Sequence, residues 1–206
     1  MEKIDLKKRF KHLYGSSAKE AVIVDVPAMN FLMIDGAGHP NTGNEFQNAM
    51  EALYGVSYTL KFMIKRGQVP ADYVVMPPEG LWWTGGANEF NVSKADAWRW
   101  TLMIMQPEYV TRNLFAEAVE QVQEKKNPAA LSKMRFESFH EGLSVQIMHV
   151  GPYGDEGPTI EKLHRFAREN GYAILGKHHE IYLSDPRRAA PEKLKTILRY
   201  PIGLAR

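Results

Sequence analysis

The same order of predicted elements occurs twice along the chain, and this repetition limits the folds that it can adopt. A strand, a glycine-containing turn, a helix and two strands follow one another from near Val22, and the same order begins again near Leu143. The polar segment Lys125-Lys126-Asn127-Pro128 separates the two series. We therefore predict an α+β fold with two strand-helix-strand-strand modules, residues 20–106 and 133–206, within one domain over residues 1–206. The modules would join their antiparallel sheets around a central cleft, and such junctions commonly bind ligands.

The composition excludes several classes of protein. The 206 residues include no cysteine, which rules out disulfides and thiolate chemistry. The formal net charge of +2 gives no sign of a nucleic-acid or membrane partner. No apolar run reaches the ~18 residues that a bilayer-spanning helix requires, and the first six residues lack the apolar core of a signal peptide. We expect a cytoplasmic protein, either a monomer or a homodimer.

Local patterns predict how some of these elements begin and pair. Residues 21–34 read as one long strand with a bend at Pro27, and residues 42–66 as the longest helix. Thr42 and Glu45 have the spacing of a capping box for that helix. Two hairpins are predicted in the second half: residues 134–139 with 143–150, and residues 172–175 with 180–183.

Two tryptophan clusters stand out in the first half of the chain. Trp82 and Trp83 are neighbours on a predicted strand, so only one of them can face a given side of the sheet. Trp98 and Trp100 are two residues apart and are predicted to share a face of the next strand. Such rings can stack on flat ligands or hold cations, each contact contributing ~0.5–2 kcal/mol. Packing within the core is the alternative, and it is the more common role for tyrosines such as Tyr58 on a helix face.

The stretch His178-His179-Glu180-Ile181-Tyr182-Leu183 reads as a strand that carries one carboxylate among apolar residues. Alternation places Glu180 and Tyr182 on the same face. Our hypothesis is an aromatic pocket, walled by the tryptophans, with Glu180 at its base. An exposed glutamate, or one paired with Arg99 or Arg199, is the alternative.

Neither a metal nor a cofactor is expected from the sequence. His178 and His179 are adjacent and should point to opposite faces, and the chain has no cysteine or zinc-binding spacing to join them with His149. Glu156 follows the turn Gly151-Pro152-Tyr153-Gly154. An acid at the start of a helix is the favoured reading, and a second carboxylate of the site is the alternative.

Several segments together resemble the GyrI-like small-molecule-binding family, in the same order and over nearly the whole chain. They are residues 26–36, Glu79-Gly80-Leu81-Trp82-Trp83, Trp98-Arg99-Trp100, Gln106-Pro107-Glu108, residues 146–153, residues 178–186 and residues 195–202. The resemblance implies two modules of the SHS2 type around a pseudo-twofold cleft. It is greatest to the stand-alone branch of the family, which is associated with hydrolysis of cyclopropane-containing DNA-alkylating compounds.

The resemblance also implies that Glu180 lies at the base of an aromatic pocket that accepts hydrophobic, aromatic or cationic small molecules. We assign Glu180, Tyr182 and Tyr153 as candidate catalytic residues, and Trp82, Trp83, Trp98, Trp100 and Tyr58 as candidate ligand-binding residues. The predicted function is xenobiotic binding with ring-opening hydrolysis. Sequestration of drugs without catalysis and a protein-interaction module of the gyrase-inhibitor type are the alternatives.

Overall fold

A computed structural model describes residues 3–67, 71–85, 90–91 and 94–205. A nine-stranded antiparallel sheet has the order β2-β8-β11-β10-β5-β6-β3-β7, with β9 paired to the outer part of β11. A parallel two-stranded sheet joins β1 (Lys3–Ile4) to β4 (Asp72–Tyr73). The strands of the large sheet are β2 (Val22–Val26), β3 (Met29–Ala37), β5 (Pro78–Trp83), β6 (Arg99–Gln106), β7 (Arg135–Phe139), β8 (Gly142–Val150), β9 (Tyr172–Ile174), β10 (His178–Tyr182) and β11 (Lys195–Leu204).

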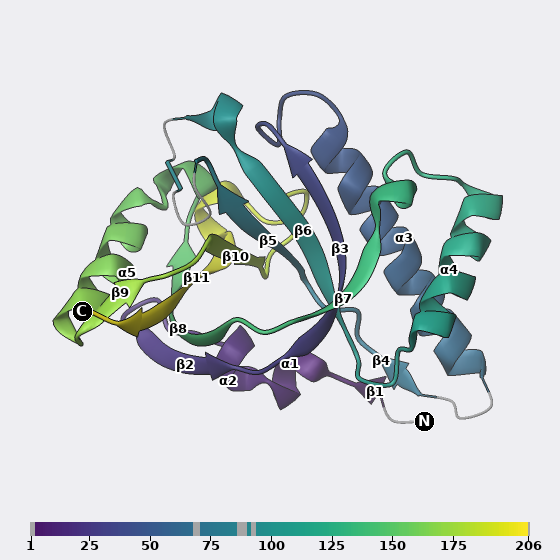
Figure 1. Cartoon of the computed structure of the whole chain (residues 1–206), viewed down its shortest axis with the longest axis horizontal. Coiled ribbons are helices and arrows are strands. Elements are labelled where there is room, and N and C mark those ends of the chain that lie inside the picture. The colour runs from purple at the N-terminus through teal and green to yellow at the C-terminus, as the bar shows by residue number, and fades with distance from the viewer. Residues whose placement is uncertain (1–2, 68–70, 86–89, 92–93, 206) are drawn as a thin grey trace.

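Three longer helices cover one face of this sheet: α3 (Glu45–Arg66), α4 (Arg112–Lys125) and α5 (Gly157–Glu169). Figure 1 shows α3 and α4 over one end of the sheet and α5 over the other. Aromatic contacts hold the first two, because Phe46 of α3 packs on Trp100 of β6 and Phe115 of α4 packs on Phe136 of β7. Leu163 and Ala167 of α5 enter a separate core cluster with β8 and β11. We call this side of the sheet the helix face.

The centre of the sheet is the pair β5–β10, and the strand order is the same on either side of it. From the centre outward, the strands are β5, β6 and β3 on one side and β10, β11 and β8 on the other. In each set a helix separates the third member from the first in the chain: α3 lies between β3 and β5, and α5 lies between β8 and β10. The α+β class with a large antiparallel sheet is thus confirmed, while a duplication into two modules stays a prediction.

The predicted hairpins are wrong. β7 pairs with β3 and is the last strand at one end of the order, whereas β8 pairs with β2 and β11 and is second from the other end. β9 pairs with β11 rather than with β10. Alternation of apolar residues indicates which segments form strands. It does not indicate which strands pair, because pairing depends on which strand edges are free and on which arrangement buries the apolar faces of the whole sheet.

Two boundaries also differ from the predictions. The long first strand is interrupted at Pro27-Ala28 and becomes β2 and β3. Asn44, not Thr42, is the residue before α3, and the Thr42 hydroxyl donates instead to the His39 carbonyl at 3.0 Å.

The short helices α1 (Leu6–Arg9) and α2 (Lys11–Tyr14) lie against the opposite face of the sheet, which we call the back face. A buried polar network joins them to it. Tyr14 donates to Glu79 at 2.8 Å, and Arg199 donates to the Leu13 carbonyl at 2.8 Å. Among the described residues, no helix combines the length and apolarity needed to cross a membrane.

The network continues through His179, whose two ring nitrogens lie 3.0 Å from carboxylate oxygens of Glu79 and Glu141. Arg199 pairs with Glu141 at 3.2 Å. Burial opposes ionisation of Glu141, but His179 and Arg199 outweigh it and lower the pKa of Glu141 to about 2. Two buried carboxylates therefore meet two buried basic groups behind the centre of the sheet.

Candidate functional site

The site is built on β10, whose alternating side chains divide between the two faces of the sheet. His178, Glu180 and Tyr182 point to the helix face, while His179 and Ile181 point to the back face, because successive side chains of a strand point oppositely. In the neighbouring strand, Gly80 lies opposite Glu180, and Trp82 lies opposite His178. The shared face of Glu180 and Tyr182 is as predicted, and the same spacing of two could have added His178.

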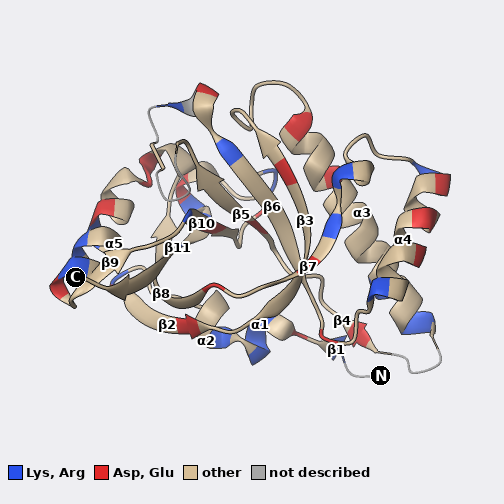
Figure 2. Cartoon of the chain, viewed as in Figure 1, with Lys and Arg blue, Asp and Glu red and all other residues tan. Residues whose placement is uncertain are grey.

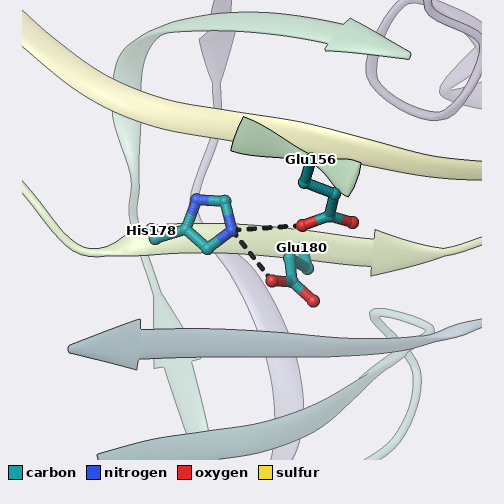
Figure 3. Close-up of side chains that lie close together, drawn as sticks. All are labelled: Glu156, His178 and Glu180. Atoms are coloured by element: carbon teal, nitrogen blue, oxygen red, sulfur yellow. Dashed lines mark hydrogen bonds and ion pairs between the residues drawn. The ribbon is translucent and has the colours of Figure 1, made fainter. Parts of the chain in front are cut away.

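Three buried side chains form an acid–base cluster at the centre of this face (Figure 3). His178 Nε2 lies 2.8 Å from Glu180 Oε1 and 3.8 Å from Glu156 Oε2. Glu156 is only 3% exposed and Glu180 only 8%. Glu156 is the residue at the start of α5, so the two readings of this residue are compatible: it begins the helix and also faces the site. We call these three residues the Glu–His–Glu cluster.

Burial and mutual charge set the protonation of the cluster. Burial, followed by the charge of Glu180, raises the pKa of Glu156 to about 8. Burial alone would lower the pKa of His178, but the neighbouring carboxyl groups of Glu156 and Glu180 outweigh it and raise that pKa to about 9. Near neutral pH we therefore expect a protonated Glu156 and an imidazolium at His178 that donates to the carboxylate of Glu180. The cluster then holds a proton donor and an ionised carboxylate side by side.

Two tyrosines border the cluster. The Trp82 indole donates to the Tyr182 hydroxyl at 2.9 Å, and Tyr182 also hydrogen-bonds Glu180. Burial, the charge of Glu180 and that hydrogen bond raise the pKa of Tyr182 well above its usual value. Tyr153 packs edge-on against Tyr182 with 5.8 Å between ring centroids and is 38% exposed. The three predicted catalytic residues, Glu180, Tyr182 and Tyr153, thus lie together, although their chemical roles stay a prediction.

Aromatic rings extend from the cluster along the sheet. Phe90 stacks on His178 with 4.6 Å between centroids, and Trp98 lies 5.6 Å from Phe90 and 5.7 Å from Trp82. His39 stacks on the other side of Trp98 at 5.2 Å. Phe90 and His39 could not be predicted for this wall, because both are on loops where no periodic pattern indicates direction. His178 is on β10, where its spacing of two from Glu180 was the available signal.

The remaining tryptophans and Tyr58 have different surroundings. Trp83 points to the back face, away from Trp82. Trp100 is fully buried over Gly36, where any side chain would overlap the indole, and packs on Phe46. Trp98 precedes β6 and so does not share a regular strand face with Trp100 as predicted. Tyr58 is 47% exposed on α3, stacked on Tyr54 with 6.2 Å between centroids. Trp82 and Trp98 are therefore the tryptophans nearest the cluster.

The Glu–His–Glu cluster also has the donor types of a metal site, with its ligand atoms within 4.8 Å of one another. It is the one such group in the described part of the chain. The 2.8 Å pair between His178 and Glu180 satisfies both charges without an ion. The arrangement therefore fits acid–base chemistry better than the separated ligands of a metal centre.

Comparison with known proteins agrees with this fold. The family described as GyrI-like small molecule binding domain matches residues 19–202. A structure of an uncharacterized conserved protein from Listeria innocua is 43% identical, with a TM-score of 0.89, and the match covers 98% of this chain and 100% of that one. A structure of a hydrolase from Listeria innocua is 42% identical, with a TM-score of 0.86 and the same coverage.

A more distant structure shares the fold alone. The C-terminal domain of EcmrR is 11% identical, with a TM-score of 0.57, over 90% of this chain and 98% of that one. No match was found among the curated proteins. Since the family match extends over most of the chain, from before β2 to within β11, the protein belongs to the GyrI-like small-molecule-binding domain family.

Proposed function

We propose that the protein binds flat, hydrophobic xenobiotics over the Glu–His–Glu cluster and hydrolyses cyclopropane-containing DNA-alkylating compounds in the cytoplasm. The observation that carries this proposal is the buried cluster of Glu156, His178 and Glu180, which lies beside tyrosine hydroxyls and aromatic rings. Clusters of this kind, with strongly shifted pKa values, are typical of catalytic sites. The 42% identity to a Listeria innocua hydrolase supports a hydrolytic reaction.

The substrate class has a cyclopropane ring conjugated to a carbonyl group. Water attacks the strained ring carbon, a carbon–oxygen bond forms, and the ring carbon–carbon bond breaks. The released electron pair moves through the conjugated system to the carbonyl oxygen, which then accepts a proton. The products balance as substrate plus one water, and no oxidant or metal is required.

In the proposed mechanism Glu180 orients the water and accepts its proton. Glu180 is suited to this role because it is a buried carboxylate whose position is fixed by His178 at 2.8 Å. Protonated Glu156, or the hydroxyl of Tyr153 or Tyr182, supplies the hydrogen bond and proton to the carbonyl oxygen. The rings of Trp82, Trp98 and Phe90 would hold the flat part of the substrate.

Binding without turnover is the second candidate, favoured by a specific observation. Glu180 with an aromatic surround suits a hydrophobic cation, because carboxylate and ring faces both attract positive charge. Tyr58, which is exposed on α3 and stacks on the half-buried Tyr54, adds flat surface. In this case Trp fluorescence would change on ligand addition, and the ligand would be recovered unaltered.

The decisive experiment is incubation with a cyclopropane-containing alkylating compound, followed by mass spectrometry. We expect a product heavier by one water, and we expect Glu180→Gln to slow its formation at least ~100-fold, in the range of general acid–base catalysis. The matched control is Glu161→Gln on the exposed side of α5, which removes a carboxylate outside the site and should keep full activity. Unaltered compound with retained binding would reject hydrolysis and leave the binding function, whereas loss of binding to the wild-type protein would reject both.

A further inference from the structure

A second candidate site lies on the back face of the sheet, around Trp83, which points away from the Glu–His–Glu cluster. Trp83 is half-buried at the end of β5, and Lys177 Nζ lies over its ring, 3.4 Å from the centroid. Lys177 directly precedes β10, so the same strand carries the cluster on one face and begins beside Trp83 on the other. Trp83 therefore lies on the opposite face of the sheet from the Glu–His–Glu cluster.

The residues around Trp83 line a groove with a volume of about 590 Å³. Its lining comes from the adjoining ends of four strands and includes Trp83, Arg99, Thr101, Asp35, Arg135 and Lys177. The register explains the grouping, because Trp83 lies opposite Arg99, and Asp35 lies opposite Thr101. Figure 2 shows charged segments at the adjoining ends of β6, β3 and β7. The volume is suited to a small organic ligand.

The charges that line the groove do not balance. Four basic residues, Arg99, Lys133, Arg135 and Lys177, face two acids, Asp35 and Glu45. Both acids are already paired with other basic residues. Arg135 donates two hydrogen bonds to Asp35, at 2.8 and 3.0 Å, and Lys133 pairs with Glu45 at 2.7 Å.

Arg99 and Lys177 have no carboxylate within ion-pair distance in the described part of the chain. Burial lowers the pKa of Lys177, and the charge of Asp35, which already pairs with Arg135, opposes that shift only in part. An anion in the groove would supply a partner for both basic groups.

We propose that this groove is a second ligand site, which binds small planar aromatic acids. The acid group would be held by the Arg99 guanidinium, which can grip a carboxylate or sulfonate with two parallel hydrogen bonds, and by Lys177. The ring would lie against the indole of Trp83. The sheet separates this site from the Glu–His–Glu cluster, so the proposal does not depend on the proposed hydrolysis.

The test is isothermal titration of the full chain with 2-naphthoate at low and high salt, with 2-naphthylmethanol as the uncharged comparator. We expect 2-naphthoate to bind more tightly than the alcohol and to weaken as salt rises, because screening acts on exposed charges. The double variant Arg99→Gln/Lys177→Gln should weaken binding at least about tenfold, as expected for loss of charge-assisted hydrogen bonds. Arg165→Gln, which removes an exposed charge from α5, should leave the affinity unchanged.

A second measurement places the ligand on one face of the sheet. In a ¹⁵N-labelled protein, the indole N–H signal of Trp83, assigned with Trp83→Phe, should shift on addition of 2-naphthoate while that of Trp82 stays in place. The proposal is overturned by absence of binding, by equal binding of acid and alcohol, by equal losses in the double variant and the Arg165→Gln control, or by a shift at Trp82 alone. Unchanged melting temperatures of the variants confirm that each result reports the groove.

Discussion

The indole of Trp82 donates to the hydroxyl of Tyr182 at 2.9 Å by passing over Gly80, the residue opposite Glu180 in the next strand. A side chain at Gly80 would place its Cβ only 2.7 Å from the Trp82 nitrogen and 2.8 Å from the Tyr182 oxygen. This hydrogen bond joins the two central strands directly beside the cluster. The absence of a side chain at position 80 is therefore a condition for the geometry of the site.

Gly80→Ala should separate Trp82 from Tyr182 and destabilise the protein by about 1–3 kcal/mol, the usual cost of overpacking. Ligand binding measured by Trp fluorescence should weaken with it. Gly55→Ala in α3 is the matched control, because its Cβ would meet only Val122 at an ordinary 3.6 Å. That variant should keep or gain stability, since alanine favours a helix over glycine. Equal stability of the two variants in urea denaturation would contradict the proposed close approach.

Tyr182→Phe should separate binding from turnover. The ring is kept, so a flat ligand should still quench Trp fluorescence, while loss of the hydroxyl removes a hydrogen bond to Glu180 and leaves the Trp82 N–H unpaired. An unpaired buried donor costs about 1–3 kcal/mol, which a lowered melting temperature would report. Turnover should fall more than affinity. An unchanged rate with the expected stability loss would assign Tyr182 a purely structural part.

The Glu–His–Glu cluster should make stability fall with pH between about pH 4.5 and pH 9. The folded-state pKa values of Glu156 and His178, about 8 and about 9, both exceed the usual 4.5 and 6.5, so the folded protein binds protons more tightly than the unfolded chain. This contribution is complete below those usual values, declines as the pH rises past them, and is absent above about pH 8 for Glu156 and about pH 9 for His178. We expect the free energy of unfolding to fall by on the order of a few kcal/mol between the usual and the folded-state pKa values. Melting temperatures measured across that pH range would report this fall.

Glu156→Gln tests the assignment of that pH dependence. Glutamine resembles the protonated acid and does not titrate, so the variant should lose less stability than the wild type between pH 5 and pH 8, a range set by the shift of Glu156. The fall between about pH 6.5 and pH 9 that His178 causes should remain. Parallel melting curves for the two proteins would mean that Glu156 is ionised at neutral pH.

The back-face network should contribute more to stability than any exposed ion pair. Arg199→Met would leave Glu141 buried without its guanidinium partner, at a cost of about 3–5 kcal/mol. Arg135→Met removes an arginine whose partner Asp35 is largely exposed, and should cost less than about 1 kcal/mol. Chemical denaturation of both variants gives the comparison, and similar losses would show that the network is not needed to hold α1 and α2.

The sequence by itself determined the α+β class, most of the strands and the family, because these depend on local periodicity and on motifs that the chain carries in order. The common face of Glu180 and Tyr182 followed from strand alternation alone. Alternation could equally have placed His178 with them, but His178 and His179 were weighed only as metal ligands, a role that their opposite directions argued against.

Only the tertiary structure decided which residues meet. Glu156 and Glu180 lie on elements separated by a helix and a strand, and the pairing of β7 with β3 instead of β8 reverses the local expectation. Strand alternation predicts that Trp82 and Trp83 point to opposite faces of the sheet. It does not predict that Trp83 contacts Lys177 or that it lies opposite Arg99 on the next strand. The physical reason is that side-chain periodicity fixes the face of each strand, whereas the partner of each strand depends on burial and register across the whole sheet.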